Sequence, residues 1–470
     1  MWLGPLVINT ILLLLIVTKQ ANATDSYQPN WKSLDSRPLP PWYDESKLGI
    51  FIHWGVFSVP SFGSEWFWDY WKSGKPEYEK FMIDNYSPSF TYQDFAHDFD
   101  AYFFDPGWWS ELIESSGAKY VVITTKHHEG FTLWPSNVSF SWNAKDVGPN
   151  RDLIGDFAAA IKKTNSVKFG VYHSLFEWFN PLHTYDQRNN FTTDRFVVTK
   201  TLPELYELVN TYHPEIVWSD GDEGPPPSYW KSMDFLAWLY NESPVKDTVV
   251  TNDRWGEGAA CHHGGYWTCS DRYTPGSVIH HKWENCFTLD KVSWGYRRNA
   301  ALNDYLSDHE IISTLAQTVS YGGNLLLNMG PRKDGRIDPL MEERLRNLGK
   351  WMRINGEAIY STKPWLHQND TNGSIWYTSK IIDSSFCVYA VMLTWPINDS
   401  LILSNIKASK GLQISLLGYT KSYIPWKYIH GELHIDLSLV SFSDMPSYEA
   451  WAFKFQNLDV DLQSFHPLVV

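Results

Sequence analysis

A short apolar run that ends in a carboxylate constrains the fold of this chain most. In residues 215–222, Ile-Val-Trp directly precedes Ser-Asp-Gly, so the run predicts a buried strand that delivers Asp220 into a loop. Four other predicted strands also end in polar groups, which are His, Tyr, Asp or Arg. Such groups on one common rim are typical of a (β/α) barrel with its active site at the carboxyl ends of the strands. We therefore predict an α/β fold with Asp220 in the site.

The predicted barrel strands are short and mostly β-branched, as expected for strands buried on both faces. They are residues 49–54, 120–125, 168–173, 215–219, 248–252 and 324–329, with two less clear strands near 277–284 and 357–360. Amphipathic helical stripes alternate with them, namely Leu153, Phe157 and Ile161, then Ile312, Leu315 and Val319, then Leu345, Leu348 and Met352. This alternation predicts a parallel sheet, here a (β/α)8-like barrel over residues 24–361.

The pattern changes after about Thr362, where strands follow one another without helices. They are predicted at residues 374–379, 386–393, 401–406, 412–419, 427–437 and 450–455. Short strands separated by turn residues such as Asn372-Gly373 predict a C-terminal antiparallel β-sandwich over residues 362–470.

The first 23 residues have the pattern of a signal peptide. Residues 11–17 form an uninterrupted apolar run, and Ala21-Asn22-Ala23 is a small-x-small cleavage pattern. A signal anchor is the alternative, but the run is short for a bilayer and polar residues follow at once. We therefore expect cleavage after Ala23, no membrane span in the mature chain, and a place in the secretory pathway, in the lysosome or outside the cell.

Sequons and cysteines fit that location. Asn85 and Asn241 are the less favourable glycosylation acceptors, because Pro88 and Pro244 directly follow their hydroxyl residues. The seven sequons are at Asn85, Asn137, Asn190, Asn241, Asn369, Asn372 and Asn398. Four cysteines are too few for a disulfide scaffold. We predict a bridge between Cys261 and Cys269 across a short loop that contains glycine, whereas Cys286 and Cys387 either pair or stay free.

Composition narrows the ligand class. The formal net charge of −14 argues against nucleic acid and anionic membrane surfaces as partners. Aromatic residues make up 16% of the chain. Most of them are expected in cores, but flat apolar sugar faces also stack on aromatic rings, so a carboxylate among many tryptophans points to sugar chemistry.

Six motifs follow one another along the chain. They are residues 47–55 (KLGIFIHWG), 126–131 (KHHEGF), 218–221 (WSDG), 281–286 (HKWENC), 293–298 (SWGYRR) and 324–331 (NLLLNMGP). Together they resemble the α-L-fucosidases of glycoside hydrolase family 29, and most of all its animal lysosomal, tissue-type members. The resemblance runs from about Trp31 to the end of the chain and is densest between Trp42 and Tyr360.

The resemblance implies a retaining mechanism without a cofactor. One carboxyl attacks the anomeric carbon, and a second, about 5–5.5 Å away, acts first as acid and then as base. Asp220 matches the family nucleophile, and we interpret Asp222 as a loop acid. Asp271 and Glu284 both match acidic positions of relatives. We prefer Asp271 as the acid/base, because the predicted bridge would tether its loop, but Glu284 remains open.

The resemblance also implies the sugar-binding residues and the partners. A 6-deoxy sugar needs hydrogen bonds for three hydroxyls and an apolar wall for its methyl group. The implied binding residues are His53, Glu65, Trp66, His127, His128, Tyr172 and Trp218, with Arg254 on the nucleophile or a hydroxyl. Relatives often carry Tyr at the position of Phe67, which puts one rim hydroxyl in question. Fucosylated glycans are the expected partners, and relatives suggest a homo-oligomer, a tetramer.

Two other functions compete. A metal-dependent hydrolase could use His127-His128 or Cys261-His262-His263, but adjacent histidines on an extended segment should point opposite ways, and neither segment has zinc-type spacing. A catalytically inactive fucose-binding lectin is the other alternative. The intact Asp220 and two candidate acids argue against it.

Overall fold

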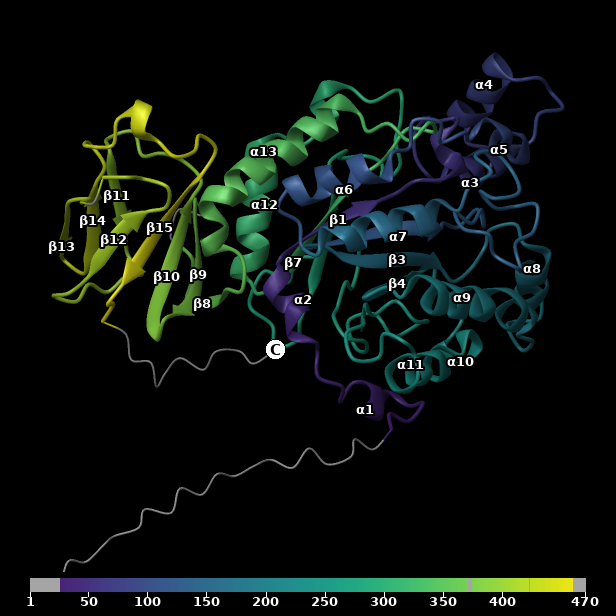
Figure 1. Cartoon of the computed structure of the whole chain (residues 1–470), viewed down its shortest axis with the longest axis horizontal. Helices are drawn as coiled ribbons and strands as arrows, with labels where there is room; N and C mark the ends of the chain where they lie inside the picture. The colour runs from purple at the N-terminus through teal and green to yellow at the C-terminus, as the bar shows by residue number, and fades with distance from the viewer. Residues whose placement is uncertain (1–25, 371–373, 422, 460–470) are drawn as a thin grey trace, which may run out of the picture.

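The chain folds into a barrel followed by two antiparallel sheets (Figure 1). The computed structural model describes residues 26–370, 374–421 and 423–459. The predicted signal peptide and the Asn372 sequon therefore lie outside the described residues. No helix in those ranges is long and apolar enough to span a bilayer.

The barrel sheet is parallel, as predicted, with the strand order β5-β4-β3-β2-β1-β7-β6. Strands that follow one another along the chain are neighbours, except β5 and β6, as expected when helices connect them. The strands are β1 (Leu48–Ile52), β2 (Tyr120–Lys126), β3 (Lys168–Ser174), β4 (Ile216–Asp220), β5 (Val250–Thr251), β6 (Glu284–Thr288) and β7 (Asn324–Met329).

Two residues take the place of an eighth strand between the edges β5 and β6. The amide of Tyr266 donates to the carbonyl of Thr251 at 3.1 Å. The amide of Trp267 donates to the carbonyl of Lys282 at 2.9 Å, and Glu284 returns a bond to the Trp267 carbonyl at 2.8 Å. These bonds join the two edges, so backbone groups that an open sheet would leave unpaired are satisfied.

The two less clear strand predictions were wrong. The segment near 357–360 contains a 3-10 helix, Gly356–Ala358, and the amides of Ile359 and Tyr360 bond locally to the Gly356 carbonyl. The strand placed at 277–284 starts only at its last residue and runs over Glu284–Thr288. Glu284 and Asn285 do not form the apolar run typical of a buried strand; inside the fold, Nδ2 of Asn285 donates to the Thr318 hydroxyl at 3.2 Å.

Helices cover the outside of the barrel. All three predicted stripes are buried, and helix α12 has the capping box formed by Ser307 and Glu310. The helices are α1 (Trp31–Leu34), α2 (Pro41–Ser46), α3 (Phe67–Lys72), α4 (Pro76–Asn85), α5 (Phe95–Asp98), α6 (Pro106–Ser115), α7 (Leu153–Thr164), α8 (Pro181–Arg188), α9 (Leu202–Tyr212), α10 (Pro227–Trp230), α11 (Ser232–Asn241), α12 (Asp308–Ser320) and α13 (Pro339–Asn355).

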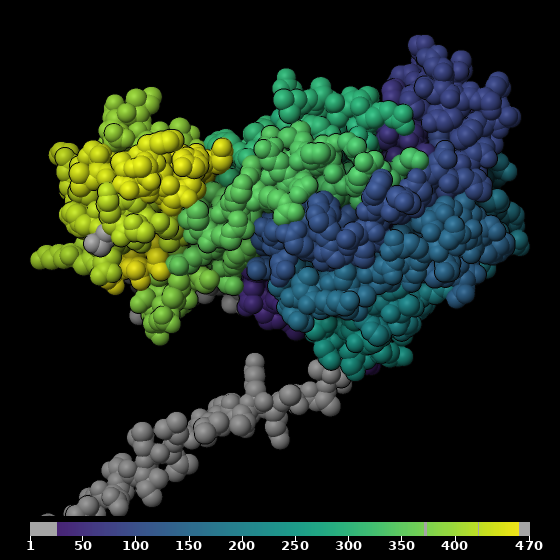
Figure 2. Space-filling model, turned by 45° about the horizontal axis from the view of Figure 1, so that its top comes forward, coloured from purple at the N-terminus to yellow at the C-terminus, as the bar shows by residue number. Residues whose placement is uncertain are grey.

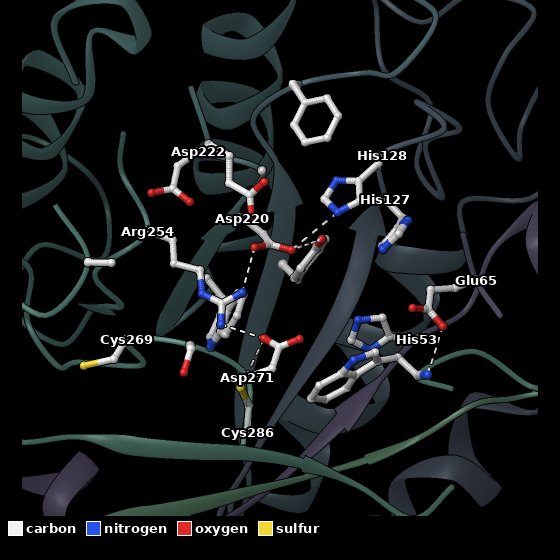
Figure 3. A pocket seen from close by; sticks show the side chains of 18 of the residues that line it. His53, Glu65, His127, His128, Asp220, Asp222, Arg254, Cys269, Asp271 and Cys286 are labelled. Carbon is white, nitrogen blue, oxygen red and sulfur yellow. Dashed lines mark hydrogen bonds and ion pairs between the residues drawn. The ribbon is translucent and has the colours of Figure 1, made fainter. Parts of the chain in front are cut away.

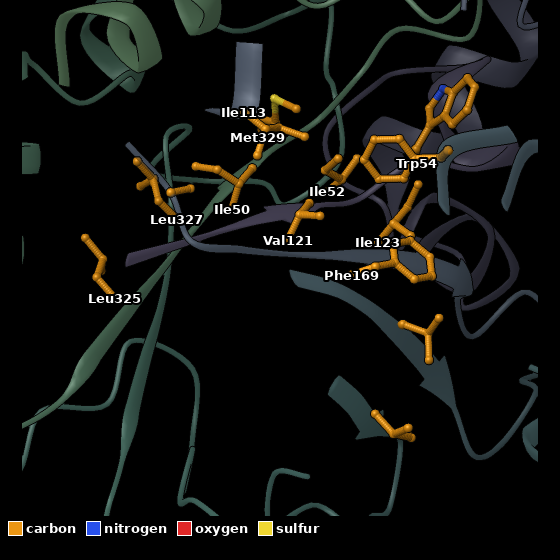
Figure 4. Close-up of a cluster of buried hydrophobic side chains, with 14 of the residues drawn as sticks. Ile50, Ile52, Trp54, Ile113, Val121, Ile123, Phe169, Leu325, Leu327 and Met329 are labelled. Carbon is orange, nitrogen blue, oxygen red and sulfur yellow. The ribbon is translucent and has the colours of Figure 1, made fainter. Parts of the chain in front are cut away.

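Alternation along the strands separates two cores. Ile50 and Ile52 of β1 belong to the apolar cluster between the sheet and its helices (Figure 4). Phe51, between them, belongs to the inner cluster of the barrel. That inner cluster is largely aromatic, with Tyr43, Tyr120, Tyr172, Trp218 and Tyr266 among its buried members. The barrel interior thus accounts for part of the high aromatic content and leads up to the carboxyl ends of the strands.

The C-terminal part consists of antiparallel sheets, as predicted, with orders β12-β15-β10-β9-β8 and β11-β14-β13. The predicted strand 427–437 is in fact a hairpin, because His430 and Gly431 have φ of 52° and 91° and form the two-residue turn. The strands are β8 (Lys363–Asn369), β9 (Ile375–Ile382), β10 (Ser385–Met392), β11 (Ser400–Leu403), β12 (Gln413–Leu416), β13 (Trp426–Ile429), β14 (Glu432–Asp436) and β15 (Trp451–Gln456).

Helix α13 joins the two parts. Trp351 donates its indole N–H to the carbonyl of Ala450 at 3.0 Å, and the amide of Ala452 donates to Asn355 at 3.2 Å. Figure 2 shows the yellow C-terminal part abutting the green surface to which this helix belongs. The sheets therefore pack on the outer face of the barrel, on the opposite side from helices α3 and α8 in Figure 1.

Candidate active site

The carboxyl ends of the barrel strands enclose a cavity of about 670 Å³ (Figure 3). Asp220, the last residue of β4, lies in it, and so do the side chains that loops bring from far along the sequence. Ten predicted site residues line the cavity together: His53, Glu65, Trp66, His127, His128, Tyr172, Trp218, Asp220, Arg254 and Asp271. Glu284 does not line it.

Asp220 is held by three neighbours. Tyr172 donates its hydroxyl to Oδ2 at 2.7 Å, and Arg254 donates to Oδ1 at 2.9 Å. Nε2 of His128 lies 3.6 Å from Oδ2. Burial opposes ionisation, but the positive charge of Arg254 and the hydrogen bond from Tyr172 hold the pKa of Asp220 well below its usual value. An ionised carboxylate in a fixed orientation is suited to nucleophilic attack.

Arg254 connects Asp220 to Asp271. Its second terminal nitrogen donates to Oδ1 of Asp271 at 2.7 Å, while its Nε donates to Thr268 at 3.2 Å. The guanidinium also lies 4.8 Å from the ring centre of Trp218. The Asp271 side chain is 46% exposed and that of Asp220 only 19%. Of the two carboxylates that share one guanidinium, Asp271 is therefore on the more open side.

The segment that carries Asp271 is fixed by a disulfide and a buried carboxylate. Cys261 and Cys269 form the predicted bridge. The side chain of Asp253 accepts hydrogen bonds from the backbone amides of both cysteines, at 2.8 and 3.0 Å, and from the amide and hydroxyl of Thr268. Cys286 and Cys387 are both free and buried, which resolves the two alternatives for them.

Glu284 lies in the barrel interior. Its side chain accepts hydrogen bonds from the hydroxyls of Tyr43 and Tyr120, both at 2.7 Å, and from the indole N–H of Trp218 at 3.0 Å. The residue is fully buried, and burial raises the pKa of Glu284 against the lowering effect of these hydrogen bonds. The structure therefore places Glu284 behind a cavity residue, out of the cavity itself.

The first strand and the loop after it supply a histidine and a carboxylate. His53 bonds through Nδ1 to the amide oxygen of Asn328 at 2.7 Å. Burial and the neighbouring His127 lower the pKa of His53 to about 4, so the ring is neutral near pH 7. Glu65 accepts hydrogen bonds from the Ser293 hydroxyl at 3.0 Å and the Trp294 amide at 2.9 Å.

His127 and His128 both line the cavity, with ring centres 4.1 Å apart. The expectation that they point opposite ways was wrong, because the chain leaves β2 at Lys126 and turns at once, with the Gly130 amide bonded to the His127 carbonyl. The Ser174 hydroxyl donates to the Phe176 carbonyl, so it accepts from Nδ1 of His128 at 2.7 Å. Burial lowers the pKa of His128 well below its usual value, which leaves Nε2 as an acceptor.

Metal-binding geometry is not found around these histidines. The described ranges contain no group of three or more His, Cys, Asp or Glu side chains arranged to hold a metal ion. Of the other candidate segment, Cys261 is in the disulfide and the His263 ring pairs with Asp35 at 2.8 Å. These side chains are engaged in structural contacts.

The comparisons with known proteins agree with this geometry. A family model described as alpha-L-fucosidase matches residues 14–357, and a model of the alpha-L-fucosidase C-terminal domain matches residues 368–456. An alpha-L-fucosidase of Branchiostoma floridae is 53% identical over 95% of this chain and 99% of its own length. The human plasma and tissue alpha-L-fucosidases are also 53% identical, each over 93% of this chain and at least 93% of their own.

The chain belongs to the alpha-L-fucosidase family.

Solved structures of the family share the fold. The structure of the Thermotoga maritima alpha-fucosidase in complex with fucose has a TM-score of 0.78 and 30% identity, over 91% of this chain and all of that one. This chain is thus a glycoside hydrolase of the alpha-L-fucosidase type, with a TIM-like barrel and C-terminal antiparallel sheets. Identity alone does not separate the plasma from the tissue relatives.

Several cavity residues of this family member were not predicted. Phe176 stacks on His128, with ring centres 4.7 Å apart and planes at 13°, and Trp294 lies 5.2 Å from His53. Trp294 falls within the motif 293–298, and Phe176 lies two residues past the end of β3, so an aromatic residue in a motif and one just past a strand end were the available signals. Cys286 and the loop acid Asp222 also line the cavity. Burial and the charge of Asp220 raise the pKa of Asp222 to about 6.

Two positions next to predicted site residues do not face the cavity. Phe67 is fully buried in the outer core, so a hydroxyl at its position would not face the cavity. His173, although it follows Tyr172, points out of the barrel and bonds to Glu204 at 2.9 Å. Alternation along β3 explains the second case.

The described sequons differ in accessibility. Asn85, Asn137, Asn190 and Asn398 are exposed, and Asn369 is partly exposed. Asn241 is engaged on both atoms of its amide, which bond to the backbone of Tyr27 at 2.8 Å each. Glycosylation at each of them remains a prediction, and Asn241 is the least accessible by this geometry.

Proposed function

We propose that the chain is a retaining exo-α-L-fucosidase in which Asp220 is the nucleophile and Asp271 the acid/base. The observation that carries the proposal is the shared guanidinium of Arg254, which contacts both carboxylates within one cavity. Retaining glycosidases need two carboxyls close together with different roles. The more enclosed, ionised Asp220 suits attack, and the more open Asp271 suits contact with a leaving group.

The proposed reaction has two displacements. An oxygen of Asp220 attacks the anomeric carbon of α-L-fucose, the glycosidic bond breaks, and the proton of Asp271 goes to the departing oxygen. In the second step the Asp271 carboxylate takes a proton from water, the hydroxyl attacks the same carbon, and Asp220 is released. The products are α-L-fucose and the free aglycone. Arg254 stabilises the negative charge of Asp220 before the covalent fucosyl ester forms and again after the ester is hydrolysed.

Asp271 fits the acid role better than Glu284 for a geometric reason. An acid/base must reach the leaving oxygen directly or through one water. Glu284 is fully buried and already accepts three hydrogen bonds inside the barrel. Oδ2 of Asp271 receives no hydrogen bond from any described residue.

The sugar ring is proposed to bind between the histidines and the aromatic walls. Nε2 of His128 accepts a hydrogen bond from one hydroxyl of the sugar, and Glu65, which the amides of Trp294 and Gly295 hold in place, accepts one from another. Trp66 and Trp218 provide apolar surface for the methyl group and the ring face. These contacts explain specificity for a 6-deoxy sugar at the end of a chain.

The location and the natural substrates are also proposals. The Cys261–Cys269 bridge fits an oxidising compartment, and the named relatives include plasma and tissue enzymes. We propose a protein of the secretory pathway, lysosomal or secreted, that removes fucose from glycoproteins, glycolipids and oligosaccharides. Its predicted domain boundaries and homo-oligomeric state stay predictions.

The stereochemistry of the first product tests the proposed function. Proton NMR during the first minutes of hydrolysis of an aryl α-L-fucoside should show α-fucose before mutarotation. Early β-fucose would mean inversion, which needs carboxyls about 6.5–9.5 Å apart and would exclude Asp220 as a nucleophile. Absence of turnover on every aryl fucoside would instead favour a fucose-binding lectin.

A further inference from the structure

A buried cluster of charged side chains lies behind the two histidines, outside the cavity. Nζ of Lys126 is 2.7 Å from Oε2 of Glu204 and 3.1 Å from Oε1 of Glu177. Lys200 lies 3.0 Å from Glu204 and 3.5 Å from Glu177. His173 bonds to Glu204 at 2.9 Å. We call these five residues the charged cluster. None of them lines the cavity.

The cluster is balanced but costly to bury. Lys126, Glu204 and His173 are fully buried, and the other two nearly so. Two lysines face two glutamates, while burial lowers the pKa of His173 to about 4 and keeps it neutral near pH 7. Buried ion pairs commonly stabilise a fold no better than apolar side chains of similar volume. Stability alone therefore does not account for this arrangement.

The cluster joins the two segments that form one side of the cavity. Lys126 directly precedes His127 and His128, and Glu177 lies between Phe176 and Trp178. Lys126 and Glu177 thus pair behind the cavity. On the other side of the same backbone, the Trp178 amide donates to the His128 carbonyl at 2.9 Å.

The aromatic side chains of these segments contact the histidines. Phe176 stacks on His128 at 4.7 Å, and the Trp178 ring centre lies 5.3 Å from that of His128 and 5.9 Å from that of His127. Residues 175–180 contain no helix or strand, so no ladder of backbone bonds fixes them. Apart from the Trp178–His128 backbone bond and one from the Leu175 amide to the Asp220 carbonyl at 2.7 Å, side-chain contacts hold this loop in place.

A glycine brings the two segments unusually close. Gly130 has φ of 83°, and a Cβ at this position would lie 2.7 Å from the carboxyl carbon of Glu177. The turn after β2 is therefore shaped around the Glu177 side chain. Glu177 is fixed in turn by Asn180, which donates to its Oε2 at 2.8 Å.

We propose that Lys126, Glu177 and Glu204 are positioning residues for the sugar-binding site. They hold the His127–His128 turn against the Phe176–Trp178 segment. The histidines and the aromatic side chains are then fixed relative to each other when the sugar binds. Glu204 anchors the pair to helix α9 and accepts a further bond from Ser139 at 2.7 Å. The proposal rests on the proposed function, because it names residues that act through that sugar site.

The proposal separates binding from chemistry. Asp220 and Asp271 come from β4 and the disulfide loop, and Arg254 holds them, so the cluster touches neither. If these residues no longer position the site, the enzyme should bind the substrate and the transition state more weakly by the same factor. Such uniform loss raises KM with little change in kcat. A purely structural role would lower the melting temperature and leave both constants unchanged.

The test variant is Glu177→Gln, which keeps the shape of the side chain and removes its charge. We expect KM for an aryl α-L-fucoside and the Kd of L-fucose, measured calorimetrically, to rise about tenfold, while kcat falls by less than about threefold. Lys200→Met, which leaves both contacts of Lys126 in place, should shift the same constants in the same direction by a smaller factor. It replaces Glu177→Gln if that variant does not fold.

Asp44→Asn is the matched control. Asp44 is buried at the amino end of the barrel and pairs with Lys47 and Lys282 at 2.6 Å each and with Lys363. This change should lower the melting temperature while KM and Kd stay at wild-type values.

The result that overturns the proposal is a Glu177→Gln or Lys200→Met protein that is destabilised like Asp44→Asn but binds fucose as wild type does. Failure of the proposed function gives a different result, because the wild-type protein itself would then not bind L-fucose or cleave the aryl fucoside.

Discussion

Trp218 donates its indole N–H to the buried carboxylate of Glu284 at 3.0 Å. The bond runs from a side chain that lines the cavity to one that does not. It connects the proposed sugar-binding wall to the aromatic interior of the barrel, where Tyr43 and Tyr120 donate to the same carboxylate. The first prediction follows from this support.

Glu284→Ala should lower turnover of every fucoside by a similar factor and should destabilise the protein. Three buried donors lose their acceptor, and each unsatisfied donor costs about 1–3 kcal/mol. Thermal unfolding and kcat/KM over a series of aryl fucosides measure both effects. Glu284→Gln, which keeps the volume and one acceptor oxygen, should be milder in both. Losses that grow with the basicity of the leaving group would instead make Glu284 the proton donor.

Asp220→Gly should fold normally and lose at least roughly three orders of magnitude in kcat, as expected when a nucleophile is removed. The side chain lies at the rim, so the core does not depend on it. Azide should enter the vacated space, restore turnover and give β-fucosyl azide, which NMR identifies. Activity close to wild type would remove Asp220 from the mechanism.

Asp271→Ala should distinguish substrates by their leaving groups. A proton donor matters most when the leaving group is poor, so fucosides of acidic phenols should be spared in the first step and natural disaccharides should lose most activity. Azide should now yield α-fucosyl azide, because Asp220 still forms the covalent intermediate. If Asp271→Ala and Glu284→Ala both show this dependence, the two carboxyls act as one coupled unit.

Buried histidines should make the protein less stable in acid. Burial lowers the pKa of His183 to about 4, below the value of about 6.5 of an unfolded chain. Between these values the unfolded state binds more protons, so stability is complete above pH 6.5 and decreases as the pH falls toward 4. His183→Leu should flatten the decline of the urea midpoint over this range. The exposed control His367→Leu should decline as wild type does, and an equal slope in all three proteins would refute the assignment.

The sequence predicted the side chains at the carboxyl ends of the strands better than those inside the barrel. Asp220, His53 and Tyr172 could be placed because each follows a short apolar run, and parallel strands bring their carboxyl ends to one rim. The position of Glu284 could not be predicted in this way. A buried carboxylate depends on tyrosines from distant segments, Tyr43 and Tyr120, and no local pattern encodes that pairing.

The two residues that close the barrel between β5 and β6 were missed for a related reason. Tyr266-Trp267 is too short to give a periodic signal, and its bonds to Thr251 and Lys282 are set by the rest of the sheet. In contrast, the Cys261–Cys269 pair was predicted correctly from spacing alone. The turn that brings His127 and His128 to one cavity depends on backbone geometry after β2, which alternation along an extended strand does not describe.

Tyr266 and Trp267 take the place of an eighth strand, and the chain between β5 and β6 contains no helix. Elsewhere around the barrel, consecutive strands are connected through helices, so an insertion would have to preserve the packing of a helix. Here loop length and sequence can vary at little cost to the core, as long as Asp253 and the disulfide keep Asp271 in place. With Asp271 as the proposed acid/base, this is the part of the rim nearest the leaving group, where we expect changes of sequence to alter the accepted glycan while the proposed fucose site stays intact.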